Sequence, residues 1–357
     1  MGRLLTGALA LAIAAAAVFA GRTLLIFNAF DTIENDFDGL CQPVVGLVGP
    51  EDLQIVPGDK TVFVSSHDRI AVAKGEATRG GIYAFSLNDP LGGESWRDRT
   101  GGAPSNFLPH GIFYYQNGEL RRLFVVNMAT TSVEIYDVSP DYELTHAETV
   151  TSPMLTSPND VFATGPRTFY VTNDVEAGRD TLLGTAHALL QKPTGTVYLF
   201  RDGEWSSVAS GLRFANGIAV NAAGDRAYVA EASGKSVALF ARSEDGALDP
   251  MRTFELDTSV DNINLDAEGD LWIGAHPKPL ELQPHERDLD HLSPSEVVRV
   301  RFGASAAEDE RETVFLDDGR LLSGSTSAAR AGDHLIIGAL YQEKFLVCQM
   351  GATLPRY

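Results

Sequence analysis

A segment that is repeated six times is the feature that most constrains how this chain can fold. Its clearest copy, residues 216–233, reads as a polar opening, a short apolar strand, a turn with glycine and a second strand rich in β-branched and aromatic residues. Comparable segments begin, roughly 45 to 65 residues apart, at Glu51, His110, Asn159, Asp261 and Ser325. Spacings of this length are typical of propeller blades. The repeat therefore predicts an all-β, six-bladed β-propeller that closes into one domain.

Each copy of the repeat opens with polar residues. The inner strand of every propeller blade lines a central channel, so equivalent positions of successive blades form a ring. Asp and Asn before a strand are also ordinary turn residues, but their recurrence in register favours a shared role. The openings are Glu51-Asp52, His110, Asn159-Asp160, Asn216, Asp261-Asn262 and Ser325-Thr326.

This ring has the chemistry of a calcium site, because calcium takes six to eight oxygen ligands and tolerates irregular geometry. Zinc is not expected, since histidine and cysteine do not cluster at ligand spacing. A bound calcium ion can polarise a carbonyl or phosphoryl oxygen and help to ionise a water molecule. We expect the carboxylate and amide oxygens to come from Glu51, Asn159, Asn216, Asp261 and Asn262.

Three members of the ring are candidates for the chemistry itself. His110 opens the second copy and could remove a proton from the metal-bound water. Asp261 is the carboxylate best placed to face both metal and water, and Glu51 is the only Glu in the ring. His276 follows the second strand of the fifth copy and is expected to border the site, whereas we expect solvated side chains at His146, His285, His291 and His334.

Composition and missing motifs exclude several other functions. The formal net charge of −20 argues against a nucleic-acid partner, whose phosphates would be repelled. The P-loop, the Rossmann fingerprint and the Gly-x-Ser-x-Gly nucleophile elbow are all absent from the sequence. We expect a monomer that acts on a small molecule.

The first 30 residues differ in character from the rest. Arg3 precedes an almost wholly apolar stretch, residues 4–20, and Val18-Phe19-Ala20 could serve as a cleavage site for an export signal. The alternative is an uncleaved anchor that crosses a bilayer. Either interpretation places residues 1–30 outside the catalytic domain of residues 31–357 and predicts that this domain is exported.

Only two cysteines occur, Cys41 and Cys348, one near each end of the predicted propeller. A disulfide between them would latch the ring where it closes, and the chain-entropy model gives it about 4–5 kcal/mol. Two unrelated buried thiols are the alternative.

Further strands and one helix are expected between the repeats. Turn-forming residues bound the strand segments expected at 81–87, 132–138, 196–201, 236–242 and 296–301. Residues 176–191 carry an apolar stripe at helical spacing. This helix could be a lid over the channel, face a membrane, or pack against a blade edge.

Several short motifs, taken in order, resemble the paraoxonase/arylesterase family of six-bladed propeller hydrolases between Cys41 and Cys348. The motifs are Gly49-Pro50-Glu51-Asp52-Leu53, Pro109-His110-Gly111-Ile112, Leu123-Phe124-Val125-Val126-Asn127, Asn159-Asp160-Val161, Thr172-Asn173-Asp174, Phe214-Ala215-Asn216-Gly217-Ile218, Val260-Asp261-Asn262, and Leu271-Trp272-Ile273-Gly274 with His276-Pro277.

The resemblance implies two calcium ions and hydrolysis of lactones, aryl esters or organophosphates. The catalytic ion would be held by the five residues already taken from the ring. A buried structural ion would use Asp52, Asp160 and the backbone carbonyl of Ile112. The resemblance also implies a retained hydrophobic N-terminus and a Cys41–Cys348 bond.

Two departures from the family pattern affect the expected chemistry. Met128 stands where the family has a second histidine, and a methionine cannot relay a proton. The loop His67-Asp68-Arg69-Ile70 is more polar than its family counterpart, and we expect it to alter substrate choice. Two rival functions are a sugar-lactone hydrolase of the gluconolactonase type and a non-catalytic propeller whose calcium is structural.

Overall fold

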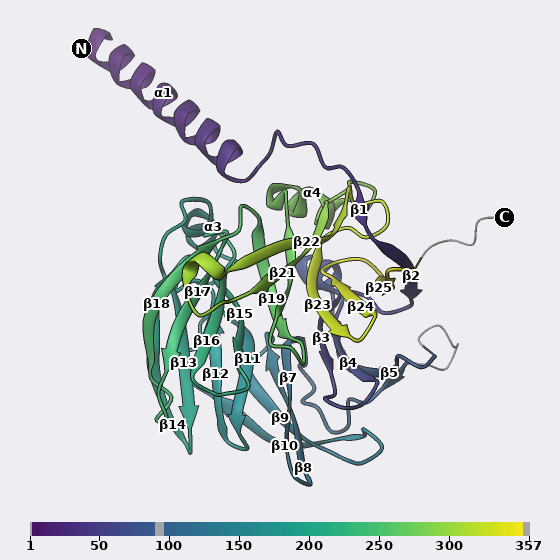
Figure 1. Cartoon of the computed structure of the whole chain (residues 1–357). Helices are drawn as coiled ribbons and strands as arrows, with labels where there is room; N and C mark the ends of the chain where they lie inside the picture. Colours follow the sequence, from purple (N-terminus) through teal and green to yellow (C-terminus); the bar gives the residue numbers. More distant parts are fainter. Residues whose placement is uncertain (1, 90–95, 353–357) are drawn as a thin grey trace, which may run out of the picture.

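The computed structural model describes residues 2–89 and 96–352, and in this part of the chain the strands form six β-sheets (Figure 1). Antiparallel pairing joins consecutive strands within each sheet, and neighbouring inner strands contact one another around the ring. The predicted six-bladed β-propeller is confirmed.

The first four blades each consist of four consecutive strands. Blade 1 contains β3 (Pro50–Ile55), β4 (Thr61–Ser66), β5 (Gly81–Ser86) and β6 (Arg97–Asp98). Blade 2 contains β7 (Pro109–Asn117), β8 (Leu120–Asn127), β9 (Ser132–Val138) and β10 (Leu144–Thr151). Blade 3 contains β11 (Pro158–Gly165), β12 (Thr168–Asn173), β13 (Gly195–Arg201) and β14 (Glu204–Leu212). Blade 4 contains β15 (Ala215–Val220), β16 (Arg226–Glu231), β17 (Ser236–Arg242) and β18 (Leu248–Glu255).

The last two blades also take strands from the N-terminal part of the chain. Blade 5 contains β19 (Ser259–Leu265), β20 (Leu271–His276), β21 (Ser295–Arg301) and β22 (Glu310–Asp317), to which β1 (Asp36–Phe37) is added. Blade 6 contains β23 (Ser325–Ala331), β24 (His334–Ala339), β25 (Lys344–Met350) and the N-terminal strand β2 (Gly39–Val45). The five strand segments expected between the repeats match β5, β9, β13, β17 and β21 to within one residue.

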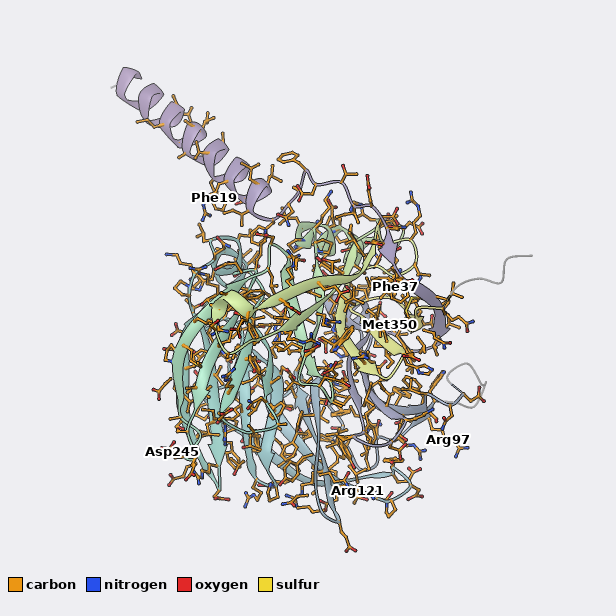
Figure 2. All side chains as sticks on the ribbon, in the orientation of Figure 1. Phe19, Phe37, Arg97, Arg121, Asp245 and Met350 are labelled. Carbon is orange, nitrogen blue, oxygen red and sulfur yellow. A yellow bond between two sulfur atoms is a disulfide. The ribbon has the colours of Figure 1, made fainter. Side chains whose placement is uncertain are left out.

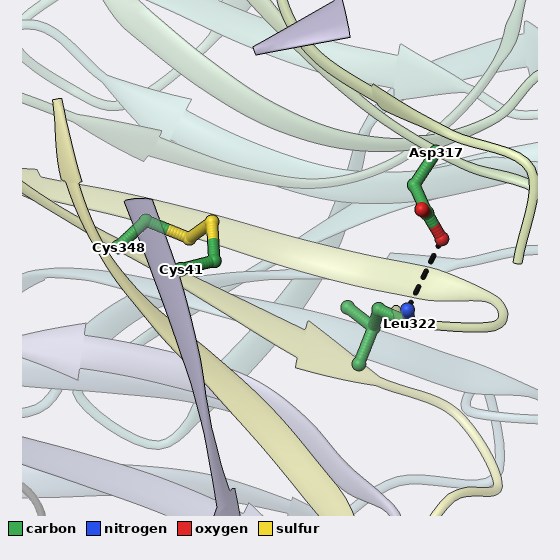
Figure 3. Close-up of a disulfide and its surroundings, with 4 residues drawn as sticks. All are labelled: Cys41, Asp317, Leu322 and Cys348. Carbon is green, nitrogen blue, oxygen red and sulfur yellow. Dashed lines mark hydrogen bonds between the residues drawn. A yellow bond between two sulfur atoms is a disulfide. The ribbon is translucent and has the colours of Figure 1, made fainter. Parts of the chain in front are cut away.

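A disulfide closes the ring at the junction of β2 and β25. Cys41 and Cys348 lie directly opposite each other in this strand pair and are bonded, with 307 residues of sequence separation between them (Figure 3). Nearby, Asp317 accepts a hydrogen bond from the Leu322 N–H at 3.1 Å (Figure 3). The disulfide predicted from the sequence is therefore present, and the alternative of two unrelated thiols is wrong.

Apolar side chains fill the spaces between adjacent blades. The buried hydrophobic residues form six clusters, and each cluster draws its members from two neighbouring blades. The inner strand β15 is buried along its whole length, whereas the outermost strand β10 alternates between buried and exposed residues. Burial on both faces keeps the inner strands rigid, and this matters because they carry the predicted site.

Helices lie at one end of the propeller, and α1 (Gly2–Ile26) extends away from it, so that Phe19 on this helix is clear of the blades (Figures 1 and 2). Within α1, Leu9–Ile26 is long and apolar enough to cross a membrane, a test that signal sequences also meet. α2 (Arg69–Ala73) follows β4, and α4 (Leu282–Arg287) follows a short 3₁₀ turn, Pro279–Glu281, between β20 and β21. A second 3₁₀ turn, Ala306–Glu308, precedes β22.

The rim helix α3 (Leu182–Leu189) is shorter than the helix expected over residues 176–191. Thr181 caps its first turn by accepting a hydrogen bond from the Gly184 N–H at 2.9 Å. The segment before it includes Gly178 with φ of +79°, a left-handed conformation that a helix interior does not allow. The expected start was therefore six residues too early.

Candidate active site

All six inner strands are irregular at the same place. In each strand the regular pairing with its neighbour skips two consecutive residues, as between Pro50 and Leu53 in β3. An irregularity of this kind re-aims side chains and often occurs beside active sites. The skipped pairs are Glu51-Asp52, His110-Gly111, Asn159-Asp160, Asn216-Gly217, Asp261-Asn262 and Thr326-Ser327.

The sixth pair corrects the sequence reading by one residue. Ser325, expected to open the ring in blade 6, pairs regularly with Ala339. Thr326 and Ser327 occupy the irregular positions instead, and their hydroxyls donate to the Glu51 carbonyl oxygen, at 2.5 and 2.7 Å. Blade 6 thus supports the backbone of Glu51.

The first residues of the other five pairs face a single cavity of about 300 Å³. Its floor is polar, and its walls come from apolar residues of the N-terminal segment, the rim turns and α3. The floor contains Glu51, His110, Asn159, Asn216 and Asp261, and the apolar walls include Phe27, Leu189, Leu280, Leu282 and Leu340. Sequence and structure therefore bring the same five polar residues together.

The second residues of the pairs are buried in another layer. Asp52 accepts hydrogen bonds from the N–H groups of Leu53 and Ile112, at 2.8 and 2.7 Å. Asp160 does the same with Val161 and Ile218, at 2.7 and 2.8 Å. A side chain at Gly111 would meet Asp160 at 2.5 Å, so glycine is required there for this approach.

The pKa values of both carboxyl groups are raised. Burial raises the pKa of Asp52 well above its usual range, and the nearby charges of Asp160 and Glu51 raise it further. Burial likewise raises the pKa of Asp160, against the lowering effect of its two backbone hydrogen bonds. A cation between or beside the two carboxyl groups would favour their ionisation.

Three buried amide oxygens of the predicted calcium set have no hydrogen-bond partner: Asn159 Oδ1, Asn216 Oδ1 and Asn262 Oδ1. Buried acceptors without partners are rare and costly in proteins. Carboxylate and amide oxygens are the ligands that calcium prefers. No group of three His, Cys, Asp or Glu side chains that could share a metal occurs in residues 2–89 and 96–352. Three of the five predicted ligands are Asn, a residue type that such a group does not include. The unpaired amide oxygens of these residues fit a calcium ion.

Glu51 is held ionised by its neighbours. Its Oε1 accepts a hydrogen bond from Asn262 Nδ2 at 2.7 Å, and its Oε2 lies 3.0 Å from His110 Nδ1 and 3.8 Å from Arg69 Nη2. Burial alone would raise the pKa of Glu51, but His110, Arg69 and Asn262 together lower it to about 2. The carboxylate is therefore charged at neutral pH.

Two arginines flank the His110 ring. Arg179 Nη1 lies 2.9 Å from His110 Nε2, and Arg69 Nη2 lies 3.0 Å from His110 Nδ1. Arg179 is fixed in turn by an ion pair with Asp174 at 2.7 Å and by a hydrogen bond to Ser157 at 3.1 Å. Burial lowers the pKa of His110 below its ordinary value, and the negative charge of Glu51 opposes this shift without reversing it. The imidazole is therefore neutral at pH 7.

Arg179 stands beside His110 in a chain that lacks the family's second histidine. Met128 is half-buried, its backbone N–H donates to the Leu108 carbonyl at 3.0 Å, and it lines a separate depression that Arg179 also borders. Sequence reasoning identified Met128 as a departure but missed Arg179, which fell inside the segment expected to be helical. Arg69 was named only as part of a polar loop.

Asp261 has a histidine partner of its own. His276 Nε2 lies 3.0 Å from Asp261 Oδ2, and both residues border the cavity. The expectation that His276 borders the site is confirmed. His291 and His334 are at least partly exposed, and His146 is half-buried with Nε2 2.8 Å from Glu134.

The expectation of a solvated His285 is wrong. Its side chain is fully buried at the end of α4, and its Nδ1 lies 2.6 Å from the His291 carbonyl oxygen. The ring of Tyr341 packs edge-on against the imidazole. The local sequence is polar and does not predict the burial, to which this contact with a distant residue contributes.

A second cavity, of about 340 Å³, contains residues from the far ends of the inner strands, including Gln54 and Asn264. It reaches Asp160 but includes neither His110 nor Asp261. Because the five polar floor residues face the other cavity, the candidate active site is the one beneath α3 and the N-terminal segment.

Comparison with known proteins places this geometry in a family. The sequence model named Arylesterase matches residues 33–350. Serum paraoxonase/arylesterase 1 of Mus musculus is 31% identical over 320 residues, covering 87% of this chain and 88% of that protein. Serum paraoxonase/arylesterase 2 of Gallus gallus is 30% identical over 364 residues, covering 98% and 100%.

Solved structures support the fold alone. A luciferin-regenerating enzyme superposes with a TM-score of 0.57 at 12% identity, over 87% of this chain and 95% of its own. A putative gluconolactonase gives a TM-score of 0.55 at 13% identity, over 89% and 97%. The match to the family model and the similarity to relatives over nearly their whole length show that the chain belongs to the arylesterase family and is an ester or lactone hydrolase.

Proposed function

We propose that the protein is a calcium-dependent hydrolase of carboxylic esters and lactones, with organophosphates as further substrates, and that residues 31–357 form its catalytic domain. The observation that carries this proposal is the set of three unpaired, buried amide oxygens from Asn159, Asn216 and Asn262. Two of these residues, Asn159 and Asn216, line the same cavity as Glu51, His110 and Asp261. Cavity, ligand oxygens and candidate bases therefore coincide.

Two calcium sites follow from the two layers of the ring. The five residues Glu51, Asn159, Asn216, Asp261 and Asn262 would hold a catalytic ion, and Asp52, Asp160 and the Ile112 carbonyl would hold a structural one. A catalytic calcium ion supplies charge that polarises the substrate carbonyl and promotes ionisation of water. The raised pKa values of Asp52 and Asp160 support the second site, since a cation would let both ionise.

The proton acceptor is Asp261 or His110, and the contacts favour Asp261. Both ring nitrogens of His110 already face Arg69 and Arg179. Asp261 has one oxygen bonded to His276, which can hold the carboxylate in place and stabilise a proton gained by the pair. In this arrangement His110 orients Glu51, while Asp261 accepts the proton of the attacking water.

The apolar cavity walls favour aryl esters and aliphatic lactones over sugar lactones. Phe27, Leu189, Leu280, Leu282 and Leu340 offer no hydrogen-bonding side chains to the hydroxyls of a sugar. The gluconolactonase-type activity is therefore the second candidate.

We further propose that the domain is exported, monomeric and associated with a membrane through α1. The disulfide fits an oxidising compartment. Beyond the candidate cleavage site, Asn28 Nδ2 donates to the carbonyls of Asp257 and Pro277 at 2.8 and 3.1 Å, so the chain after Ala20 is tied to the propeller.

The test is hydrolysis of phenyl acetate, an aliphatic lactone and gluconolactone, each with added calcium and with EDTA. We expect the first two to be hydrolysed and EDTA to abolish both activities. Preferential turnover of gluconolactone would instead favour the sugar-lactone alternative. Turnover of none of the three would refute the proposed substrate classes.

A further inference from the structure

The His110 ring is surrounded by more hydrogen-bond donors than it can accept. Arg69 and Arg179 can only donate, and Glu51 at pH 7 can only accept. A neutral imidazole offers one acceptor and one donor. Nδ1 of His110 nevertheless lies 3.0 Å from both Glu51 Oε2 and Arg69 Nη2.

Only one tautomer satisfies most of these contacts. If His110 carries its proton on Nδ1, it donates to Glu51 and accepts from Arg179 at Nε2. The Arg69 Nη2 group then faces an N–H and has no acceptor there. With the proton on Nε2, two hydrogen bonds to His110 would be lost, the one from Arg179 and the one to Glu51, instead of one.

Arg69 is also the arginine whose charge is poorly compensated. Arg179 has the Asp174 carboxylate at 2.7 Å. The other contacts of Arg69 are the carbonyl oxygens of Gly49 and Leu340, at 3.1 and 3.5 Å, and its nearest carboxylate is Glu51 at 3.8 Å. The Arg69 side chain is only 10% exposed, so water compensates little of its charge.

The unsatisfied guanidinium lies next to the cavity. Two residues in contact with Arg69, His110 and Leu340, line that cavity, and Glu51 forms part of its floor. If Glu51 serves as a calcium ligand, as in the proposed function, its charge is no longer available to Arg69. A buried cation beside a ligand cavity then calls for an anion on the ligand.

We propose that Arg69 binds an anionic group on the substrate, so that the preferred substrate is an ester or lactone that also carries a free carboxylate. This inference rests on the proposed function for the reaction but concerns a separate part of the substrate. A carboxylate fits better than a phosphate, because its single negative charge matches the single positive charge of Arg69 and its two oxygens match the fork of the guanidinium.

The experiment compares two γ-butyrolactones that differ only in one ring substituent, a carboxylate or the neutral carboxamide. For the calcium-loaded wild type we expect kcat/KM to be about ten-fold higher for the carboxylate, as for a hydrogen bond between charged groups. Arg69→Gln should remove this preference, and Arg69→Lys should keep part of it. Arg320→Gln is the matched control, since its side chain is 73% exposed and pairs with Asp318.

Equal or faster hydrolysis of the carboxamide by the wild type would overturn the inference, even if the variants fail to fold. A ten-fold preference that survives in Arg69→Gln would also overturn it. If neither lactone is hydrolysed, the proposed function fails, and calorimetry then decides the inference. Tighter binding of the ring-opened dicarboxylate than of its monoamide, lost in Arg69→Gln, would support it; equal binding would overturn it.

Discussion

Two asparagines of the ring should respond differently to truncation, because only one of them is bonded to another side chain. Asn216 is buried with its Oδ1 unpaired, whereas Asn262 donates a 2.7 Å hydrogen bond to Glu51. In chelated protein, Asn216→Ala removes an unsatisfied acceptor, and we expect the free energy of unfolding to change by less than about 1 kcal/mol. Asn262→Ala removes a hydrogen bond to a charged group and should cost about 1.5–3 kcal/mol.

In calcium-loaded protein, by contrast, we expect Asn216→Ala to lower the free energy of unfolding. Loss of one oxygen ligand removes an interaction worth about 1–3 kcal/mol, which corresponds to roughly 5- to 150-fold weaker calcium binding. The assay is urea unfolding of wild type and both variants in EGTA and in saturating calcium, with calorimetric titration of calcium. If Asn216→Ala destabilises the chelated protein as much as the calcium-loaded one, its oxygen has a structural partner and the argument is refuted.

Three further predictions concern closure, pH and the proton path. Replacing both Cys41 and Cys348 by Ser should lower the free energy of unfolding by about 5 kcal/mol, because the 307-residue loop is no longer closed in the unfolded state. Unfolding in guanidinium measures this loss, and a loss under 1 kcal/mol would contradict the prediction. Burial alone would raise the pKa of Glu134, but hydrogen bonds from Thr149, Ser132, His146 and Asn127 lower it. The ionised Glu134 should therefore stabilise the folded protein above the unfolded pKa near 4.5, and this stabilisation should be lost as the pH falls through the lowered folded pKa. Glu134→Gln should make the difference in unfolding free energy between pH 7 and pH 4 smaller. An unchanged difference would count against this. Met128→His should raise aryl ester turnover only when it is combined with Arg179→Gln, which frees His110 Nε2 from its contact with Arg179. If steady-state assays show the same gain in turnover for Met128→His alone, Arg179 does not prevent His110 from interacting with residue 128.

Most of the fold and the ring of polar residues could be predicted from the sequence because they recur. Six copies in register fix which residues open each inner strand, and the two cysteines lie at the predicted closure. The register failed only in blade 6, where Ser325, Thr326 and Ser327 follow one another and residue type does not distinguish the correct pair.

The residues that sequence reasoning missed act through contacts between distant segments. Arg69 is the first residue of α2 and Arg179 lies in the segment before α3, and only the closed ring brings them to the predicted His110 on β7. The burial of His285 has the same origin, since it depends on Tyr341 in another blade. Local patterns contain no signal for such contacts.

The central claim is that a calcium ion binds to the irregular positions of the inner strands beneath the apolar cavity. Anomalous X-ray diffraction from crystals of the calcium-loaded protein tests it most directly. We predict an anomalous peak at ligand distance from the oxygens of Glu51, Asn159, Asn216, Asp261 and Asn262. A map with no calcium peak at these oxygens, from protein that hydrolyses esters in the same solution, would contradict the claim.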